Sequence, residues 1–253
     1  MKILALDSSG LVAGVAVTED DNLLGEYTIN YKKTHSQTLL PMLDEVAKMI
    51  ELDLNTIDAI AVSAGPGSFT GLRIGSATAK GLALALNKQI ISVPTVDALA
   101  YNLWGCREQV CPLMDARRQQ AYTGLYTFSD GQMQTLLPQC AAGIDEITAK
   151  INESGKKTVF LGDGVPVFAD YLKEIYRYHT CLHLHIAISS VRHVLRYSAA
   201  FYTVRERLRM QLYTSRIICA CRRRKESVRK RQGIFAYENT ADDRGRHSGC
   251  CTN

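Results

Sequence analysis

The order of apolar segments over the first hundred residues constrains the fold of this chain more than any other feature. Three short apolar segments, residues 2–7, 14–18 and 23–29, are separated only by turn sequences, which predicts an antiparallel meander of three strands. After residue 34, helical and strand patterns alternate. A meander followed by crossovers excludes a Rossmann fold, which alternates strand and helix from its start. Helices are expected at residues 36–50, 72–86 and 96–104, and strands at residues 57–62 and 90–93.

This order resembles the α/β fold of actin, hexokinase and Hsp70 (the ribonuclease H-like or ASKHA fold). In that fold the first hairpin, which opens here with Asp7-Ser8-Ser9, faces nucleotide phosphates. Strand patterns at residues 110–115, 120–127 and 158–164 predict a partial second copy of the same unit. We therefore expect a two-lobed molecule. Its N-terminal lobe would span residues 1–104, and its partial second lobe residues 105–177.

Residues 65–75, GPGSFTGLRIG, form a glycine-rich loop that leads into a predicted helix. Gly65 and Gly67 permit positive φ or close backbone approach, and Ser68 or Thr70 is suited to cap the helix. The segment lacks the Lys-Ser/Thr of a Walker A loop, and Thr70 replaces the last glycine of GxGxxG. Two interpretations stay open. The loop either presents helix N–H groups to an anion or is a tight strand-to-helix connection without a ligand.

The same eleven residues are identified as the signature of the TsaB (YeaZ) family. Other segments agree with that family in order and spacing, and the resemblance covers about residues 1–175. It implies a subunit of the bacterial machinery that forms N6-threonylcarbamoyladenosine at position 37 of tRNAs reading ANN codons, acting with the catalytic subunit TsaD and the ATPase TsaE. The agreeing segments are ILALDSS (3–9), HSQTLLPMLDEV (35–46), VPTVDALA (93–100) and DARRQQAYTGLY (115–126).

The resemblance also implies that the chain is not itself the catalyst. The catalytic paralogue carries a His-x-x-x-His metal pair on a helix, whereas the matching helix here, residues 96–104, contains no histidine. Residues 1–177 hold a single histidine, His35, which we interpret as a helix-entry residue. Asp7 and Asp115 are interpreted as strand-terminal residues that anchor turns. We expect no catalytic residue and no metal site. The alternative is a stand-alone nucleotide-dependent transferase or kinase of the actin-like fold.

The two helices at residues 36–50 and 72–86 resemble those that family members use to bind the catalytic subunit, or to form a homodimer in its absence. The alternative is that both only cover their own sheet. No tightly bound cofactor is expected, but ATP or ADP could lie at the interface of the complex. The predicted contact residues are Leu39, Leu43, Leu72, Gly75, Ser76, Ala79 and Ala83. The residues predicted to face phosphates are Asp7, Ser8, Ser9, Gly67 and Ser68.

The net charge of +5 conceals two parts of opposite sign. Residues 1–177 hold 15 Lys and Arg against 20 Asp and Glu, whereas residues 178–253 hold 15 against 5. We expect the family resemblance to end near residue 178 and the tail to be poorly ordered. Its basic cluster, residues 222–231, could attract tRNA phosphates, form a solvated end, or result from translation in a shifted frame. In a shifted frame, codons for residues 217–219 can encode the Tyr-(Leu/Met)-Arg that is typical near the family's C-terminus.

No apolar segment approaches the roughly 18–20 residues that cross a bilayer. The apolar run at residues 1–6 is too short for a secretory signal and is followed at once by an acid. The eight cysteines contain no CxxC pair, which favours reduced thiols over a zinc site or a disulfide framework. We therefore expect a cytoplasmic protein without a membrane partner.

Overall fold

The computed structural model describes residues 1–20, 22–31, 34–130, 132–175 and 181–182. The first of its two five-stranded sheets has the order β3-β2-β1-β4-β5. The strands β1 (Lys2–Asp7), β2 (Ala13–Glu19) and β3 (Asn22–Ile29) form the expected antiparallel meander. The strands β4 (Ala59–Gly65) and β5 (Gln89–Pro94) extend the sheet in parallel from β1.

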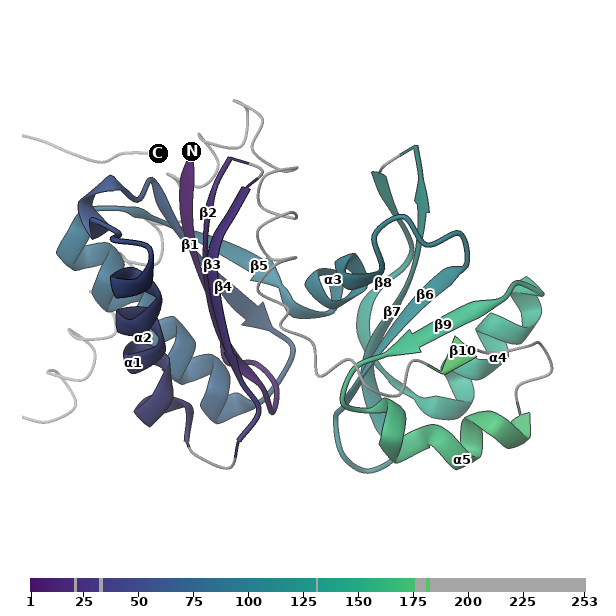
Figure 1. Ribbon diagram of the computed structural model, residues 1–253. Coiled ribbons are helices and arrows are strands. Elements are labelled where there is room, and N and C mark those ends of the chain that lie inside the picture. The colour runs from purple at the N-terminus through teal and green to yellow at the C-terminus, as the bar shows by residue number, and fades with distance from the viewer. Residues whose placement is uncertain (21, 32–33, 131, 176–180, 183–253) are drawn as a thin grey trace, which may run out of the picture. The chain divides into compact units, whose positions relative to one another are not determined.

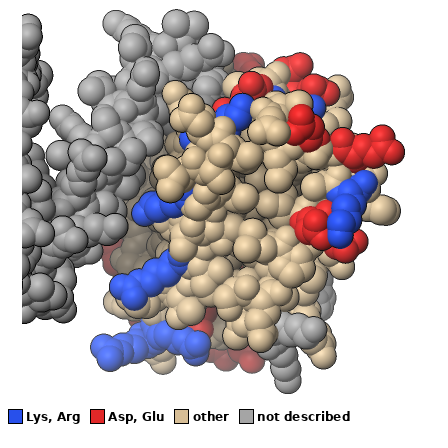
Figure 2. Space-filling view, turned by 90° about the vertical axis from the view of Figure 1, so that its left-hand side faces the viewer, with Lys and Arg blue, Asp and Glu red and all other residues tan. Residues whose placement is uncertain are grey.

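The helices α1 (His35–Met49) and α2 (Phe69–Leu86) lie together on one face of this sheet (Figure 1). A 3₁₀ turn, Leu54–Thr56, leads into β4, and the short helix α3 (Thr95–Ala100) follows β5 and continues as a 3₁₀ turn over Tyr101–Leu103. Over the middle of the outer surface of α1 and α2, few charged side chains appear among the tan ones (Figure 2). The predicted order of elements is therefore confirmed for this half of the chain.

The second sheet repeats the connectivity of the first. It has the order β8-β7-β6-β9-β10, with β6 to β8 antiparallel and β9 and β10 parallel to β6. Its fifth strand lies beyond residue 177, the expected end of the second lobe, and the expected lobe bounds stay a prediction. The elements are β6 (Gln109–Asp115), β7 (Gln120–Ser129), β8 (Gln132–Gly143), α4 (Ile144–Ser154), β9 (Thr158–Leu161), α5 (Val165–Ile175) and β10 (Cys181–Leu182).

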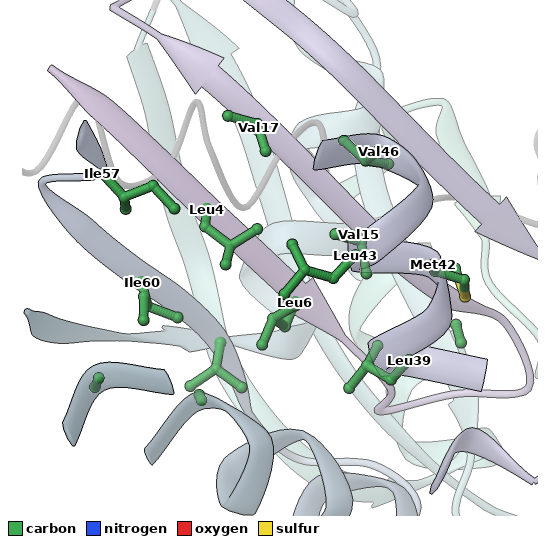
Figure 3. Packing of buried hydrophobic residues seen from close by; sticks show 14 residues of the cluster. Leu4, Leu6, Val15, Val17, Leu39, Met42, Leu43, Val46, Ile57 and Ile60 are labelled. Atoms are coloured by element: carbon green, nitrogen blue, oxygen red, sulfur yellow. The ribbon is translucent and has the colours of Figure 1, made fainter. Parts of the chain in front are cut away.

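Strand β1 is buried on both faces, and Figure 3 shows two of its side chains, Leu4 and Leu6, among their neighbours on one face. Leu4 and Leu6 belong to a cluster that also contains residues of α1 and α2. Ile3 and Ala5 belong to a second cluster, made mostly of small residues on the other face. Because successive strand residues alternate between faces, the uninterrupted apolar run of β1 serves both clusters at once.

Five of the residues predicted to contact a partner lie beneath their own helices. They are Leu39, Leu43, Gly75, Ala79 and Ala83. Leu39 is 1% exposed and Ala79 0% exposed, because small and aliphatic residues at this spacing let the helices approach the sheet closely. All five are buried within the single chain, and that they contact a partner stays a prediction. The two remaining residues, Leu72 and Ser76, are half-buried.

In the part of the chain that the structure describes, no helix combines the length and apolar character needed to span a membrane. Of the residues after 177, the structure describes Cys181–Leu182, which form β10. The expectations for the tail, namely its poor order, the basic cluster at residues 222–231 and the frame change at residues 217–219, fall outside the described residues.

Candidate functional site

The glycine-rich loop between β4 and α2 packs tightly against the turn that follows β1. The backbone N–H of Ser68 donates to the carbonyl oxygen of Ser9 over 2.7 Å. A Cβ atom at Gly67 would lie 2.5 Å from that same oxygen, and a Cβ at Gly71 would lie 1.9 Å from the carbonyl oxygen of Ser8. No side chain fits in such gaps, so glycine is required here because two backbones approach each other.

The five residues predicted to face phosphates are brought together, but they bond largely to their immediate surroundings. The hydroxyl of Ser8 donates to the carbonyl oxygen of Gly71 over 2.9 Å, and the Asp7 carboxylate accepts the N–H of Ser9 over 2.9 Å. Asp7, Ser8 and Ser9 are all buried. This geometry favours the interpretation of a tight strand-to-helix connection. That these residues face a nucleotide stays a prediction.

The cap of α2 is the serine rather than the threonine of the glycine-rich loop. The Ser68 hydroxyl oxygen accepts the N–H of Gly71 over 3.2 Å, and α2 begins at Phe69, three residues earlier than predicted. Gly65 has a φ of +104°, as expected for its place in the turn, and its peptide bond to Pro66 is cis. The Gly65 N–H donates to the Thr95 hydroxyl over 3.1 Å, which fixes the start of the loop to α3.

The second sheet has a comparable contact between a glycine turn and its first strand. Gly162 and Gly164 follow β9, and a Cβ atom on them would lie 2.3 Å and 2.9 Å from the carbonyl oxygen of Leu113. The Gly164 N–H donates to that oxygen over 2.9 Å. Between the two glycines, the Asp163 carboxylate accepts the N–H of Asp115 over 3.3 Å, while burial raises the pKa of Asp163. The sequence signal for this contact is the Gly-Asp-Gly that follows a predicted strand.

Asp7 and Asp115 occupy corresponding positions in the two copies, each as the last residue of its first strand. Each carboxylate accepts a backbone N–H two residues further on, from Ser9 over 2.9 Å and from Arg117 over 2.8 Å. These are the Asx turns in which an aspartate stabilises the chain reversal after a strand. The interpretation of both residues as turn anchors is confirmed.

His35 is the first residue of α1, as its interpretation as a helix-entry residue predicted. Its Nε2 lies 2.9 Å from the carbonyl oxygen of Gly10, so the ring connects the start of α1 to the turn after β1. Among the residues that the structure describes, no three His, Cys, Asp or Glu side chains lie close enough together to form a metal site.

The outer face of α1 and α2 exposes several apolar side chains. On α2, Phe69 is 68% exposed and Leu84 85% exposed, and Ala77, Gly81 and the charged Lys80 are exposed between them. The Arg73 guanidinium lies 3.9 Å from the centroid of the Phe69 ring, so the cation partly covers one end of this strip. Exposed Leu40, Pro41 and Met49 add apolar surface on α1. Sequence reasoning missed these residues because α2 has small side chains on several faces.

Comparison with known proteins places the chain in a family. A family model described as TsaD, tRNA N6-adenosine threonylcarbamoyltransferase, matches residues 22–215. The tRNA threonylcarbamoyladenosine biosynthesis protein TsaB of Bacillus subtilis is 31% identical over 175 residues, which cover 69% of this chain and 76% of that protein. The chain belongs to the TsaB family. The match to the TsaD family model continues to residue 215, whereas the alignment with the Bacillus subtilis protein spans 175 residues, the length over which the TsaB resemblance was expected.

Further TsaB relatives agree with this assignment. The protein of the same name from Escherichia coli is 34% identical over 128 residues, which cover 50% of this chain and 55% of that protein. The solved structure of YeaZ from Pseudomonas aeruginosa matches with a TM-score of 0.65 and 25% identity, over 81% of this chain and 93% of that chain. The predicted actin-like α/β fold of TsaB (YeaZ) proteins is thereby confirmed for the described residues.

Proposed function

We propose that this chain is a non-catalytic subunit of the assembly that forms N6-threonylcarbamoyladenosine at position 37 of tRNAs reading ANN codons. It would act in the cytoplasm, bind and support a TsaD-type catalytic subunit and a TsaE-type ATPase, and meet tRNA through that complex. In isolation it would form a homodimer. The proposal is supported by membership of the TsaB family, whose relatives are named for the biosynthesis of this nucleoside.

The observation that carries the proposal is the exposed apolar strip on α2. Leu84 is 85% exposed and Phe69 68% exposed, and a Cβ atom added at Gly81 would meet no atom within 4 Å. A leucine and a phenylalanine that extend into water beside small residues leave room for a second helix to approach closely. Figure 2 shows this face with its charged groups mainly toward the margins.

A stand-alone kinase or transferase is less well supported. Such an enzyme needs space for phosphates at the turn after β1, where the Ser68 N–H instead donates to the Ser9 carbonyl oxygen over 2.7 Å. The Ser8 hydroxyl is likewise engaged with Gly71. We propose accordingly that the chain holds no cofactor tightly of its own, and that ATP or ADP would be held where the subunits of the complex meet.

Co-purification with the cognate TsaD-type subunit tests this proposal. We expect Leu84→Arg to abolish association, because a guanidinium would be buried unpaired in an apolar interface. The matched control is Ala149→Arg, which adds the same charge to an exposed position of α4 on the second sheet. Its association should equal that of the wild type.

Both variants should keep the thermal midpoint of the wild type, because Leu84 and Ala149 are exposed. Full association of the folded Leu84→Arg protein would contradict the interface. If the Leu84→Arg protein associated normally but tRNA modification were lost, that result would instead favour a catalytic role for this chain.

A further inference from the structure

The turn between β6 and β7 has a backbone conformation that its residues disfavour. Arg117, Arg118 and Gln119 have φ angles of +69°, +53° and +60°. The Gln120 N–H donates to the Arg117 carbonyl oxygen over 3.0 Å, so Arg118 and Gln119 are the two central residues of a tight hairpin turn. Turns with positive φ at both central positions strongly prefer Asn-Gly or Asp-Gly. Arginine and glutamine at these positions satisfy no local structural need.

The surrounding structure nevertheless holds this turn firmly. The Asp115 carboxylate accepts the Arg117 N–H over 2.8 Å, and the Ala116 N–H donates to the Gln120 carbonyl oxygen over 3.0 Å. The Ile144 N–H, at the start of α4, approaches the Gln119 carbonyl oxygen to 3.4 Å. Unfavourable backbone conformations that neighbouring groups enforce occur preferentially at functional sites.

The same turn presents donors that remain unused within the part of the chain that the structure describes. There the backbone N–H groups of Arg118 and Gln119 donate no hydrogen bond, and the Arg118 side chain forms no ion pair. The Arg117 guanidinium is 4.0 Å from the Asp115 carboxylate, at the limit of an ion pair, and its side chain is 87% exposed. One short segment therefore carries two guanidinium groups and two backbone amides that are free within the described residues.

Four carboxylates lie near this turn in the chain or in the fold, and each is already engaged. Asp115 accepts the Arg117 N–H, and Asp163 accepts the Asp115 N–H. On α4, Asp145 accepts the Tyr171 hydroxyl, and Glu146 pairs with Lys150 at 3.6 Å. Arg117 has only its long contact of 4.0 Å with Asp115. Arg118 pairs with none of these acids within the described residues and is available to an anion from outside the chain.

We propose that the β6–β7 turn is a binding site for phosphate groups, formed by the guanidinium groups of Arg117 and Arg118 and the backbone N–H groups of Arg118 and Gln119. Arginine matches the geometry of phosphate oxygens with paired N–H donors, and free backbone amides in a tight turn add fixed partial charges. The phosphate could belong to a free nucleotide or to an RNA backbone. The site does not depend on the proposed function, because it lies on the second sheet and requires no partner subunit.

The variant that tests the site replaces the turn by the residues that its backbone prefers, Arg118→Asn with Gln119→Gly. The substitution keeps the turn and should raise the thermal midpoint by about 2–4 °C, which verifies that the protein is folded. It also removes the Arg118 guanidinium, which forms no ion pair within the described residues. The matched control is Arg107→Ala, which removes one arginine from an exposed position before β6.

Binding is measured on the full-length ¹⁵N-labelled chain by titration with inorganic phosphate, with ATP in the absence of metal, and with a short single-stranded RNA. We expect saturable shifts of the residue 118 and 119 amide signals with at least one probe, and at least tenfold weaker binding of that probe by the double variant.

Saturation by phosphate or ATP assigns the site to a nucleotide, and saturation by RNA alone assigns it to a polynucleotide. Unshifted amide signals with all three probes, or double-variant affinity within twofold of wild type, would overturn the proposal. An equal loss of affinity in Arg107→Ala would overturn it as well, since net charge alone would then explain the binding.

Discussion

Cys111 illustrates how completely the second sheet encloses some of its side chains. It is 0% exposed in the middle of β6, and its Sγ lies 3.3 Å from the Thr123 hydroxyl oxygen. Burial, which disfavours the thiolate, raises the pKa of Cys111 from 9.0 to about 12. The thiolate is the nucleophilic form, so this side chain is inert wherever the protein is folded at ordinary pH. Its role is packing.

We expect iodoacetamide to leave Cys111 unmodified in the native protein at pH 8, while the partly exposed Cys106 reacts. Peptide mass spectrometry after timed alkylation measures both rates, and unfolding in urea should make them similar. Because the folded pKa is raised, the unfolded chain loses this proton first as pH rises. Stability should therefore fall as pH rises from 9.0 towards 12. Native Cys111 reacting as fast as Cys106 would contradict its burial.

Two residue-level interpretations from the sequence are confirmed for the same physical reason. Asp7 and Asp115 each end an apolar strand and precede polar turn residues, and an aspartate at such a place bonds the backbone two residues ahead. This interaction is local, so the sequence contains all the information needed to predict it. The contact of Ser8 with Gly71 spans 63 residues, and no local pattern predicts it.

At the scale of elements, α2 has a glycine at one position where no side chain would fit and another glycine at a position where a side chain would fit. A Cβ atom at Gly71 would lie 1.9 Å from the Ser8 carbonyl oxygen, whereas a Cβ at Gly81 would meet no atom within 4 Å. The first turn of the helix therefore fits closely against the turn after β1. Further along, the outer face of the helix has open space above it.

We predict opposite effects for the same substitution at these two positions. Gly71→Ala should lower the free energy of unfolding by about 1–3 kcal/mol or more, because the backbones must separate to admit the methyl group. Gly81→Ala should raise it by up to about 1 kcal/mol, because alanine favours the helix and the space is open. Urea unfolding followed by circular dichroism measures both, each variant serving as the control for the other. Equal effects of the two substitutions would show that α2 is not seated as described.

The face of α2 that packs on the sheet could not be derived from its sequence. Small residues recur on several sides of this helix, so the 3.6-residue period does not distinguish the inner face from the outer face. Gly75 and Ala79 are inner residues, while Ala77 and Gly81 are outer ones. The inner face of α2 is distinguished from its outer face only by where β1 lies, and by where the turn that contains Ser8 meets the start of the helix. For this reason the predicted contact residues on α2 include Gly75, Ala79 and Ala83, which the structure places on its inner face.

The elements of the second sheet that the sequence did not predict have weak local patterns. Strand β8 contains Pro138 and exposed Leu136, and it lies at the edge of its sheet, where one side needs no partner. Its pairing with β7 has register shifts between Thr123 and Leu125 and between Leu125 and Tyr126, which interrupt the alternation of faces. The meander of the first sheet was easier to predict because short turns separate its three strands.

For the molecule as a whole, α3 has contacts with both sheets. Ala98 belongs to a cluster of the first sheet, and Val96 and Leu99 belong to a cluster with residues of the second. A polar contact accompanies this packing. The hydroxyl of Tyr126, a fully buried residue of β7, donates to the Asp97 carboxylate over 2.6 Å. The link from β5 into the second sheet therefore depends on a hydrogen bond to a charged group as well as on apolar surface.

We predict that Tyr126→Phe lowers the free energy of unfolding by about 1.5–3 kcal/mol, because it removes a hydrogen bond to a charged acceptor from a buried position. Tyr122→Phe is the matched control on the same strand, since Tyr122 is half-buried and its hydroxyl forms no hydrogen bond within the described residues. It should have little effect. Chemical denaturation with tryptophan fluorescence and circular dichroism measures both variants. Similar losses for the two tyrosines would contradict the special role of the Asp97 contact.

Because the two sheets share one connectivity, the effect of a substitution in one half can be compared with that of a similar substitution in the other half. Gly65 at the end of β4 and Gly162 directly after β9 have matching positive φ angles of +104° and +106°. The same alanine substitution can thus be made twice in one polypeptide, under one solvent and one temperature. We propose docking for the first half and anion binding for the second. If both proposals hold, the two alanine variants should lose similar stability but should be impaired in different functions. Such paired measurements separate the properties that both halves share from the properties that belong to one half alone.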